Sequence, residues 1–187
     1  SATPSASPSN SPSASPSSSP SPTNLALGKL ATQSSVRNSG VAGRAVDGSI
    51  DASSYTHTLE ETGAWWMVDL GQATTIDKVR IYNRVLASER LQQFYVELLN
   101  ETQAVVPDGS QYRGGEFSTR MLDFSFNGIL AQFVRVRFDD NYTNFLSLSE
   151  LEVYGNSAST SLSTTPTSSP SSIPSASPSA SPSAAPS

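Results

Sequence analysis

Apolar and polar residues alternate with a period of two in several short stretches of this chain. This period places successive side chains on opposite faces of an extended strand. The stretches that show it are residues 65–70, 75–83, 94–99, 119–126, 132–138 and 148–154. We therefore expect each of them to form a β-strand.

Several of the expected strands have one face for solvent. In the second stretch, the alternation places Ile76 on the same, polar face of the strand as Lys78 and places Val79 on the opposite face. The third stretch repeats this arrangement. In the fifth stretch, Arg135 and Arg137 alternate with apolar residues, and we expect them to line a solvated strand face.

Turn signals, and not helical periodicity, separate the strands. Asp108 with Gly109, and Gly114 with Gly115, are pairs that favour turns, and no long helical pattern lies between the alternating stretches. Short strands separated by such signals predict an all-β fold, either an antiparallel sandwich or a barrel.

Both ends of the chain differ in composition from its middle. All Lys, Arg, Asp and Glu residues lie between Lys29 and Glu152, whereas the ends consist largely of Ser, Pro and Ala, with prolines four residues apart. Such segments have too little apolar surface to fold. We expect disordered linkers over residues 1–23 and 156–187, one domain over residues 24–155, and a place within a longer multi-domain protein.

The composition argues against several classes of function. The net charge is −5 and no Lys/Arg-rich stripe occurs, so we expect no nucleic-acid partner. No apolar run is long enough to cross a bilayer, and we expect no direct membrane insertion. The absence of Cys excludes disulfides and thiolate metal sites. No catalytic motif or marked carboxylate spacing is visible, and we expect a protein that is not an enzyme.

Two sequons, at Asn100 and Asn141, favour an extracellular location. Ser/Thr/Pro-rich tracts are typical of O-glycosylated stalks and favour the same location. We therefore expect the protein to be secreted or associated with the cell wall.

The segment from residue 41 to residue 71 concentrates the chemistry of the chain. It contains the only histidine, His57, and the clustered carboxylates Asp47 and Asp51, in a stretch too polar and too rich in Gly for a helix. It ends in the apolar stretch with Trp65 and Trp66, of which at least one must point inward because neighbours on a strand face opposite sides. We expect a polar loop that leads into a buried strand.

Five motifs in the folded part carry a resemblance to a known family. They are residues 24–29 (NLALGK), 31–35 (ATQSS), 45–48 (AVDG), 65–71 (WWMVDLG) and 149–155 (SELEVYG). In this order they resemble a discoidin-type domain, also called the coagulation factor 5/8 C domain, and within that superfamily the F-type lectins, or fucolectins. The resemblance implies a discoidin-like β-jelly-roll sandwich that binds ligands through loops at one end.

The resemblance to F-type lectins implies a site for L-fucose or a similar terminal sugar on fucosylated glycans or glycoproteins. The family uses a His in a Thr-His-Thr loop, an Arg after an Asn at a strand end, and a second basic residue shortly after. His57, Arg84 and Arg90 match these positions, and Tyr55 or Leu86 could contact the C6 methyl group of fucose. Guanidiniums and an imidazole supply the donors and the acceptor that sugar hydroxyls need.

The region around Arg84 also departs from the family motif. Leu86 stands where the family has an Asp, Arg90 comes one residue early, and Ala87-Ser88 replaces a vicinal Cys pair. Two alternatives therefore stay open: a discoidin-like adhesion domain that binds protein or lipid, and a structural module without sugar binding. Arg90 could instead pair with Glu89 or Glu97 on the surface.

The resemblance further implies a structural Ca²⁺ ion. The positions that match the family's ligands are Arg44, Asp47, Ser49, Ser54, Ser149 and Glu150, of which Arg44, Ser49 and Ser149 would contribute carbonyls. Ca²⁺ prefers six to eight oxygen ligands, which carbonyls and two carboxylates can supply. The alternative is that Asp47 and Gly48 form a simple turn.

Overall fold

The computed structural model describes residues 22–115 and 119–156. The predicted Ser/Pro/Ala-rich linkers lie outside these residues, apart from residues 22, 23 and 156. Within the described ranges the regular structure consists of strands and two short 3₁₀ helices. No helix in these ranges has the length and apolar character that a membrane span needs.

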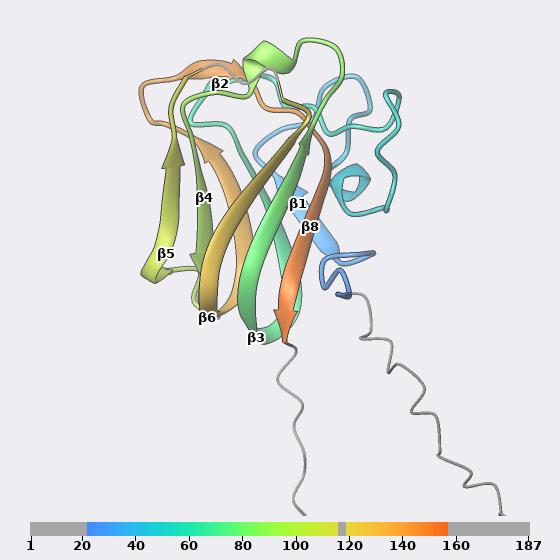
Figure 1. Cartoon of the computed structure of the whole chain (residues 1–187). Coiled ribbons are helices and arrows are strands. Elements are labelled where there is room, and N and C mark those ends of the chain that lie inside the picture. Colours follow the sequence, from blue (N-terminus) through green and yellow to red (C-terminus); the bar gives the residue numbers. More distant parts are fainter. Residues whose placement is uncertain (1–21, 116–118, 157–187) are drawn as a thin grey trace, which may run out of the picture.

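Eight strands form an antiparallel fold (Figure 1). They are β1 (Leu30–Gln33), β2 (Glu60–Thr62), β3 (Trp65–Asn83), β4 (Phe94–Leu99), β5 (Val105–Arg113), β6 (Met121–Phe138), β7 (Thr143–Phe145) and β8 (Leu148–Asn156). The main sheet has the order β1-β3-β6-β4-β5, and β8 also pairs with β3. Strands β2 and β7 form a separate two-stranded sheet.

Strands β3 and β6 are long because each joins two of the predicted stretches. The first half of β3 pairs with β1 and with the second half of β6, whereas its second half pairs with β8 and with the first half of β6. Register shifts separate Asp69 from Thr74 and Ile76 from Lys78. Such bulges bend a strand, so the two long strands pass from one layer of the sandwich to the other.

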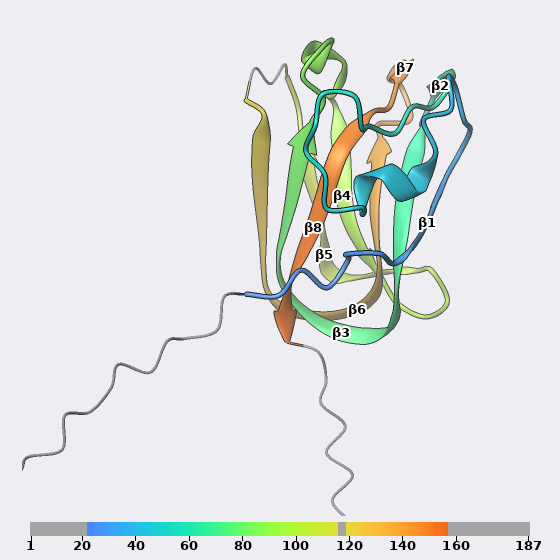
Figure 2. The same ribbon diagram turned by 90° about the vertical axis from the view of Figure 1, so that its right-hand side faces the viewer.

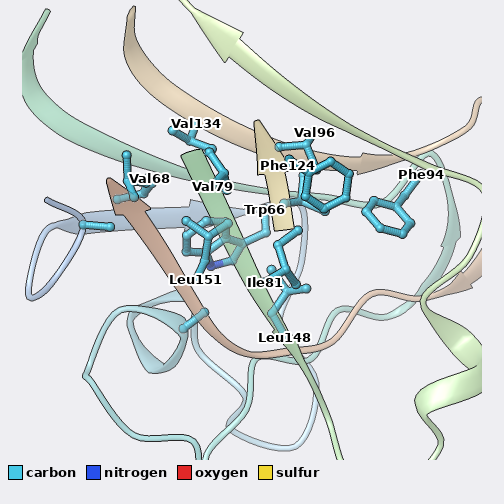
Figure 3. Packing of buried hydrophobic residues seen from close by; sticks show 14 of the residues in the cluster. Trp66, Val68, Val79, Ile81, Phe94, Val96, Phe124, Val134, Leu148 and Leu151 are labelled. Carbon is cyan, nitrogen blue, oxygen red and sulfur yellow. The ribbon is translucent and has the colours of Figure 1, made fainter. Parts of the chain in front are cut away.

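The core lies between these layers (Figure 3). Trp66 is fully buried at its centre, which confirms the prediction that at least one of the two tryptophans points inward. Its indole Nε1 donates a hydrogen bond to the carbonyl of Ala42 at 3.0 Å. Ile81 and Leu151 come from the opposite layer. The all-β, discoidin-like jelly roll predicted from the sequence is therefore confirmed.

The two ends of the sandwich differ. Figures 1 and 2 show the 3₁₀ helix η2 (Ser88–Arg90), together with β2 and β7, at one end, whereas β8 finishes at the other. The second 3₁₀ helix, η1 (Ala42–Ala45), lies at the side of the sandwich. The loop with η2, and with it the predicted sugar-site residue Arg90, thus lies at one end, whereas Arg44 of the predicted metal site belongs to η1 at the side.

Three predictions about strand faces are wrong. Ile76 is buried with Val79, because the bulge beside Lys78 changes the phase of the alternation. The expected wet side of β4 is covered, since Glu97 is buried. Arg135 and Arg137 are half-buried partners of that carboxylate and do not simply line a solvated face.

One predicted turn is also wrong. Asp108 and Gly109 lie inside β5, where Asp108 has a φ of 56° and the register with β4 shifts. A β-bulge requires the same permissive residues as a turn, so the sequence signal was correct for the backbone conformation but not for a chain reversal.

Candidate ligand-binding site

The Thr-His-Thr segment is fixed by a strand-like pairing with the start of β8. The amides of Thr56 and Thr58 donate to the carbonyls of Leu148 and Leu146, and the two threonine hydroxyls accept hydrogen bonds from the amides of the same leucines. Both threonines are buried. Because neighbouring side chains on an extended segment alternate, His57 faces away from β8 and into the loop cluster.

A glycine holds the other side of His57. The amide of His57 donates to the carbonyl of Gly40 at 2.9 Å, and the amide of Arg37 donates to the carbonyl of His57 at 2.8 Å. A Cβ added to Gly40 would lie 2.6 Å from Cβ and from the backbone nitrogen of His57. Only glycine permits this close approach, which also brings Arg37 beside the histidine.

Asn83 determines where Arg84 emerges from β3. The Asn83 side chain is fully buried, its amide nitrogen donates to the carbonyl of Ser88 at 2.8 Å, and its backbone amide donates to Arg120. The loop after β3 therefore folds back on itself. Arg84 then stacks on Tyr55, with Cζ 4.3 Å from the ring centroid.

Phe145 is the centre of the other half of the cluster. Its place is set by the pairing of β7 with β2, in which it lies opposite Glu60. The Cζ atoms of Arg37 and Arg90 lie 4.7 and 4.8 Å from its ring centroid, and the His57 ring packs against it edge-on at 5.4 Å. Arg90 is also fixed through its carbonyl, which accepts from the Tyr142 hydroxyl.

The polar atoms of this cluster are poised for hydrogen bonding. Both ring nitrogens of His57, and Nε and Nη1 of Arg84, are buried without a hydrogen-bond partner among the described residues. Burial, and then the positive charges of the neighbouring arginines, lower the pKa of His57 below 6.5. The imidazole is therefore neutral at pH 7 and offers one donor and one acceptor, beside fixed guanidinium donors.

A second group of oxygen atoms lies near this site. The Asp47 carboxylate accepts from the Ser49 amide at 2.7 Å and from the Ser54 hydroxyl at 2.9 Å. The Gly48 amide donates to Oε1 of Glu150 at 3.2 Å, which brings two carboxylates to the same loop. Arg44 is attached to this loop through a hydrogen bond to the carbonyl of Ser53.

Glu150 is the unusual member of the group. It is 1% exposed, and its Oε2 atom has no hydrogen-bond partner among the described residues. Burial, reinforced by the charge of Asp47, raises its pKa to about 7. The described residues contain no cluster of three His, Cys, Asp or Glu side chains. The donor set is thus two carboxylates with hydroxyl and carbonyl oxygens, which fits a hard cation such as Ca²⁺.

The structure brings together all four predicted sugar-site residues, His57, Arg84, Arg90 and Tyr55. Of the predicted metal ligands, hydrogen bonds join Asp47, Ser49 and Ser54, and connect Glu150 through Gly48. Ser149 directly precedes Glu150 in the chain, and Arg44 reaches the loop through its hydrogen bond to the carbonyl of Ser53. Leu86, the other predicted apolar contact, is 71% exposed.

Two members of the cluster, Arg37 and Phe145, were not predicted. Neither lies in one of the alternating stretches or motifs recognised in the sequence. The long-range bonds of His57 to residue 37, and the pairing of β2 with β7, bring them to the site. The sequence feature that could have pointed to Arg37 is weak: it is a single arginine shortly before a turn that contains Gly40.

Comparison with known proteins identifies similar domains. A family model for NedA-like, galactose-binding domains of the coagulation factor 5/8 type C group matches residues 44–136. The lectin domain of lectinolysin, solved in complex with Lewis b antigen, is 38% identical; the match covers 72% of this chain and 98% of that chain, with a TM-score of 0.67. No curated protein sequence matches significantly.

Two further structures extend the comparison. A fucose-binding module from Streptococcus pneumoniae is 32% identical, with coverage of 71% of this chain and 97% of that chain and a TM-score of 0.65. A fucolectin from the serum of striped bass, Morone saxatilis, is 29% identical, with coverage of 72% and 47% and a TM-score of 0.60. The chain therefore belongs to the coagulation factor 5/8 type C domain family, and its resemblance to the F-type lectins of that family is confirmed.

Proposed function

We propose that this domain is a lectin that recognises L-fucose, or a similar terminal sugar, on fucosylated glycans. The observation that carries the proposal is the buried pair of His57 and Arg84, whose nitrogens lack partners among the described residues and face a loop cluster with aromatic walls. Buried polar atoms without partners cost free energy, and sugar hydroxyls would supply the missing partners. The lectin modules that are similar to this chain support the same proposal.

Each side chain would have a defined role. His57 would donate to one hydroxyl and accept from another, while Arg84 and Arg90 would donate to hydroxyls or to the ring oxygen. The Tyr55 and Phe145 rings hold the guanidiniums in place by cation–π contact. The exposed part of Tyr55 would contact the apolar C6 methyl group of fucose.

A Ca²⁺ ion held by Asp47 and Glu150 would stabilise the loop that precedes the sugar site. When bound, the ion would neutralise the two carboxylates and cross-link the loop to β8. Asp47 is bonded to Ser54, and Ser54 directly precedes Tyr55. Ser49, Arg44 and Ser149 would complete the ligand set with carbonyl oxygens. The metal would therefore act on the sugar site through the backbone.

The proposal extends to context. The similar structures are lectin or carbohydrate-binding modules, and we propose the same non-enzymatic role here. An extracellular location and a place in a longer protein agree with the Ser/Pro-rich ends of the sequence. Several such modules on flexible spacers would gain avidity for a surface rich in glycans.

Titration calorimetry tests the proposal. The full chain is titrated with L-fucose and, in parallel, with D-galactose, each in calcium and in chelator. We expect saturable heat with L-fucose that weakens in chelator. Asp47→Ala should remove the effect of calcium on binding and on Tm. Absence of heat with both sugars would overturn the sugar proposal, and a Tm that ignores chelator would overturn the metal.

A further inference from the structure

Three arginines meet at the proposed sugar pocket without an acidic partner. In the described ranges, ion pairs join the arginines at positions 80, 135 and 137 to carboxylates. Arg37, Arg84 and Arg90 form no ion pair with the described residues, and their guanidiniums lie over aromatic rings. The proposed sugar site therefore carries positive charge that no carboxylate of the described chain neutralises through an ion pair.

The three charges lie at two depths. Arg84 has buried nitrogen atoms and lies beside His57 in the deeper part of the cluster. Arg37 is exposed and Arg90 is half-buried, and both contact the single ring of Phe145. The geometry thus separates an inner group, suited to sugar hydroxyls, from a rim with two guanidiniums.

The loop between Arg84 and Arg90 carries a single acidic residue, Glu89, which pairs with none of the described arginines. Residues 85–88 are Val, Leu, Ala and Ser, and Leu86 is the most exposed of them. Glu89 follows in η2, where it is exposed and forms no ion pair with any described residue. The positive field at His57 is strong enough that all three arginines contribute to lowering its pKa. Like charges held together in this way are stabilised when an anion binds between or beside them.

We propose that this site prefers glycans that carry an anionic group, a sulfate ester or a carboxylate, next to the bound sugar, with Arg37 holding the anion together with the N–H donors of Arg90 that the sugar does not use. The inference rests on the proposed sugar site and deepens it. Guanidinium groups match sulfate and carboxylate oxygens with paired N–H donors. The inner group of His57 and Arg84 binds the neutral part of the same ligand.

Calorimetry with matched ligands tests the proposal. The full chain is titrated with L-fucose, with L-fucose sulfated at each hydroxyl in turn, and with fucosylated oligosaccharides with and without sialic acid. We expect at least one anionic ligand to bind about tenfold more tightly than its neutral counterpart, which is the effect of one charge-assisted contact. The gain should shrink at high ionic strength. The sulfated and sialylated arms distinguish the two sources of negative charge.

Variants then assign the effect to the rim. Arg37→Gln should reduce the ratio of anionic to neutral affinity to about one. Leu86→Asp, which adds a carboxylate at an exposed position between the arginines, should reduce the same ratio. Lys29→Gln is the matched control, since it removes an exposed positive charge at the start of β1 and should leave the ratio unchanged.

The outcomes separate this inference from the proposed function. Tight binding of L-fucose with no gain from any anionic group would overturn the inference and leave the lectin proposal intact. Silence of all ligands, neutral and anionic, would overturn both. A gain that survives Arg37→Gln and Leu86→Asp but disappears in Lys29→Gln would show attraction to net charge alone, and would also overturn the role of the rim.

Discussion

His57 and Arg84 show what the site requires of single residues. Their nitrogens are buried and lack partners in the described part of the chain, although most buried polar atoms in proteins are paired. Unpaired buried nitrogens lower the stability of the fold. The hydrogen bonds of the buried threonines on either side of His57 offset this loss. If His57 and Arg84 bind the sugar as proposed, they trade stability for affinity.

Arg84→Met tests this trade directly. Methionine keeps an unbranched side chain that can pack on Tyr55, but it removes the unpaired donors. We expect L-fucose affinity to fall by more than about tenfold, while the free energy of unfolding without sugar stays within about 1 kcal/mol of the original value or rises. Calorimetry and chemical denaturation give the two numbers. A large loss of stability would show that Arg84 is primarily structural.

Gly40→Ala tests the positioning of His57. The new Cβ would lie 2.6 Å from the His57 backbone nitrogen, so the Thr-His-Thr segment must shift. We expect sugar affinity to fall about tenfold or more and stability to fall by about 1–3 kcal/mol.

Gly43→Ala is the matched control, since a Cβ there meets nothing within 4 Å. We expect Gly43→Ala to leave both the sugar affinity and the free energy of unfolding nearly unchanged. Equal effects of the two substitutions would contradict the role of close approach at Gly40.

At the scale of elements, the outer face of the main sheet is held by a charge cluster. Glu97 on β4 accepts hydrogen bonds from Arg135 at 2.8 Å and Arg137 at 2.9 Å, both on β6. The Arg137 guanidinium also lies 4.3 Å from the ring centroid of Tyr95, the next outward residue on β4. This cluster explains why a strand with an alternating sequence is buried on both faces.

Glu97→Gln should weaken the pairing of these strands. The carboxylate side chain is only 3% exposed, and the substitution leaves two half-buried guanidiniums without its negative charge, with only the exposed Asp140 remaining as a partner of Arg137. We expect a loss of about 2–4 kcal/mol in the free energy of unfolding.

Asp123→Asn serves as the comparison for that variant. Asp123 also pairs with an arginine, Arg80, but its side chain is 40% exposed. Its removal should cost less than about 1 kcal/mol. Denaturation curves of the two variants give the difference, and equal losses would refute the claim that burial makes the Glu97 cluster important.

At the scale of the whole molecule, one stretch of backbone connects the proposed metal and sugar sites. Asp47 is bonded to Ser54, which precedes Tyr55, and Thr56 is bonded to Leu148, which lies just before Glu150. A change that stabilises the loop around Asp47 should therefore also stabilise the segment that carries Tyr55 and His57. The far end of the sandwich, where β8 finishes, takes no part in either site (Figure 2).

Glu150 should couple stability to pH. Its pKa of about 7 in the folded protein lies above its ordinary value of 4.5, so folding without metal favours the protonated form. In chelator, its contribution to stability is complete below about pH 4.5, decreases as the pH rises through about 7, and is then lost. We expect a decrease of roughly 1–3 kcal/mol. Comparison of Tm against pH for the original chain and Glu150→Gln isolates this contribution.

Calcium should reverse the trend, because only the ionised carboxylate binds the ion. The stabilisation by calcium should therefore increase across the same pH range. Glu150→Gln should remove both the decrease in chelator and the gain in calcium. If the curves of Tm against pH for the original chain and for Glu150→Gln ran parallel both in chelator and in calcium, a role for Glu150 in metal binding would be contradicted.

Most of the fold could be predicted from the pattern of residues, but the joins between strands could not. The two halves of β3 carry separate alternating patterns around Gly71, which has a φ of 87°, so a continuous bent strand looks like two strands and a turn. The phase error at Ile76 has the same origin. Whether a bulge forms depends on the strand with which the segment pairs, and the alternation pattern of one segment does not show which strand that is.

The candidate site was predicted in part, for a comparable reason. His57 and Arg84 lie in motifs, because each needs particular neighbours. These are the threonines that bond to Leu146 and Leu148 at the start of β8, and the Asn83 amide that folds back the next loop. Arg37 and Phe145 have no such local requirement. They reach the pocket through pairings between segments far apart in the chain.

The sequence by itself determined the period of the strands, the class of fold, and the chemical type of the groups at the binding end, because these depend on local alternation and on residue identity. Only the tertiary structure decided which polar residues are buried, such as Glu97, which charges share a ring, and which buried nitrogens lack partners. Burial and electrostatic environment are set by everything that packs around a group, and most of what packs around these groups comes from other parts of the chain.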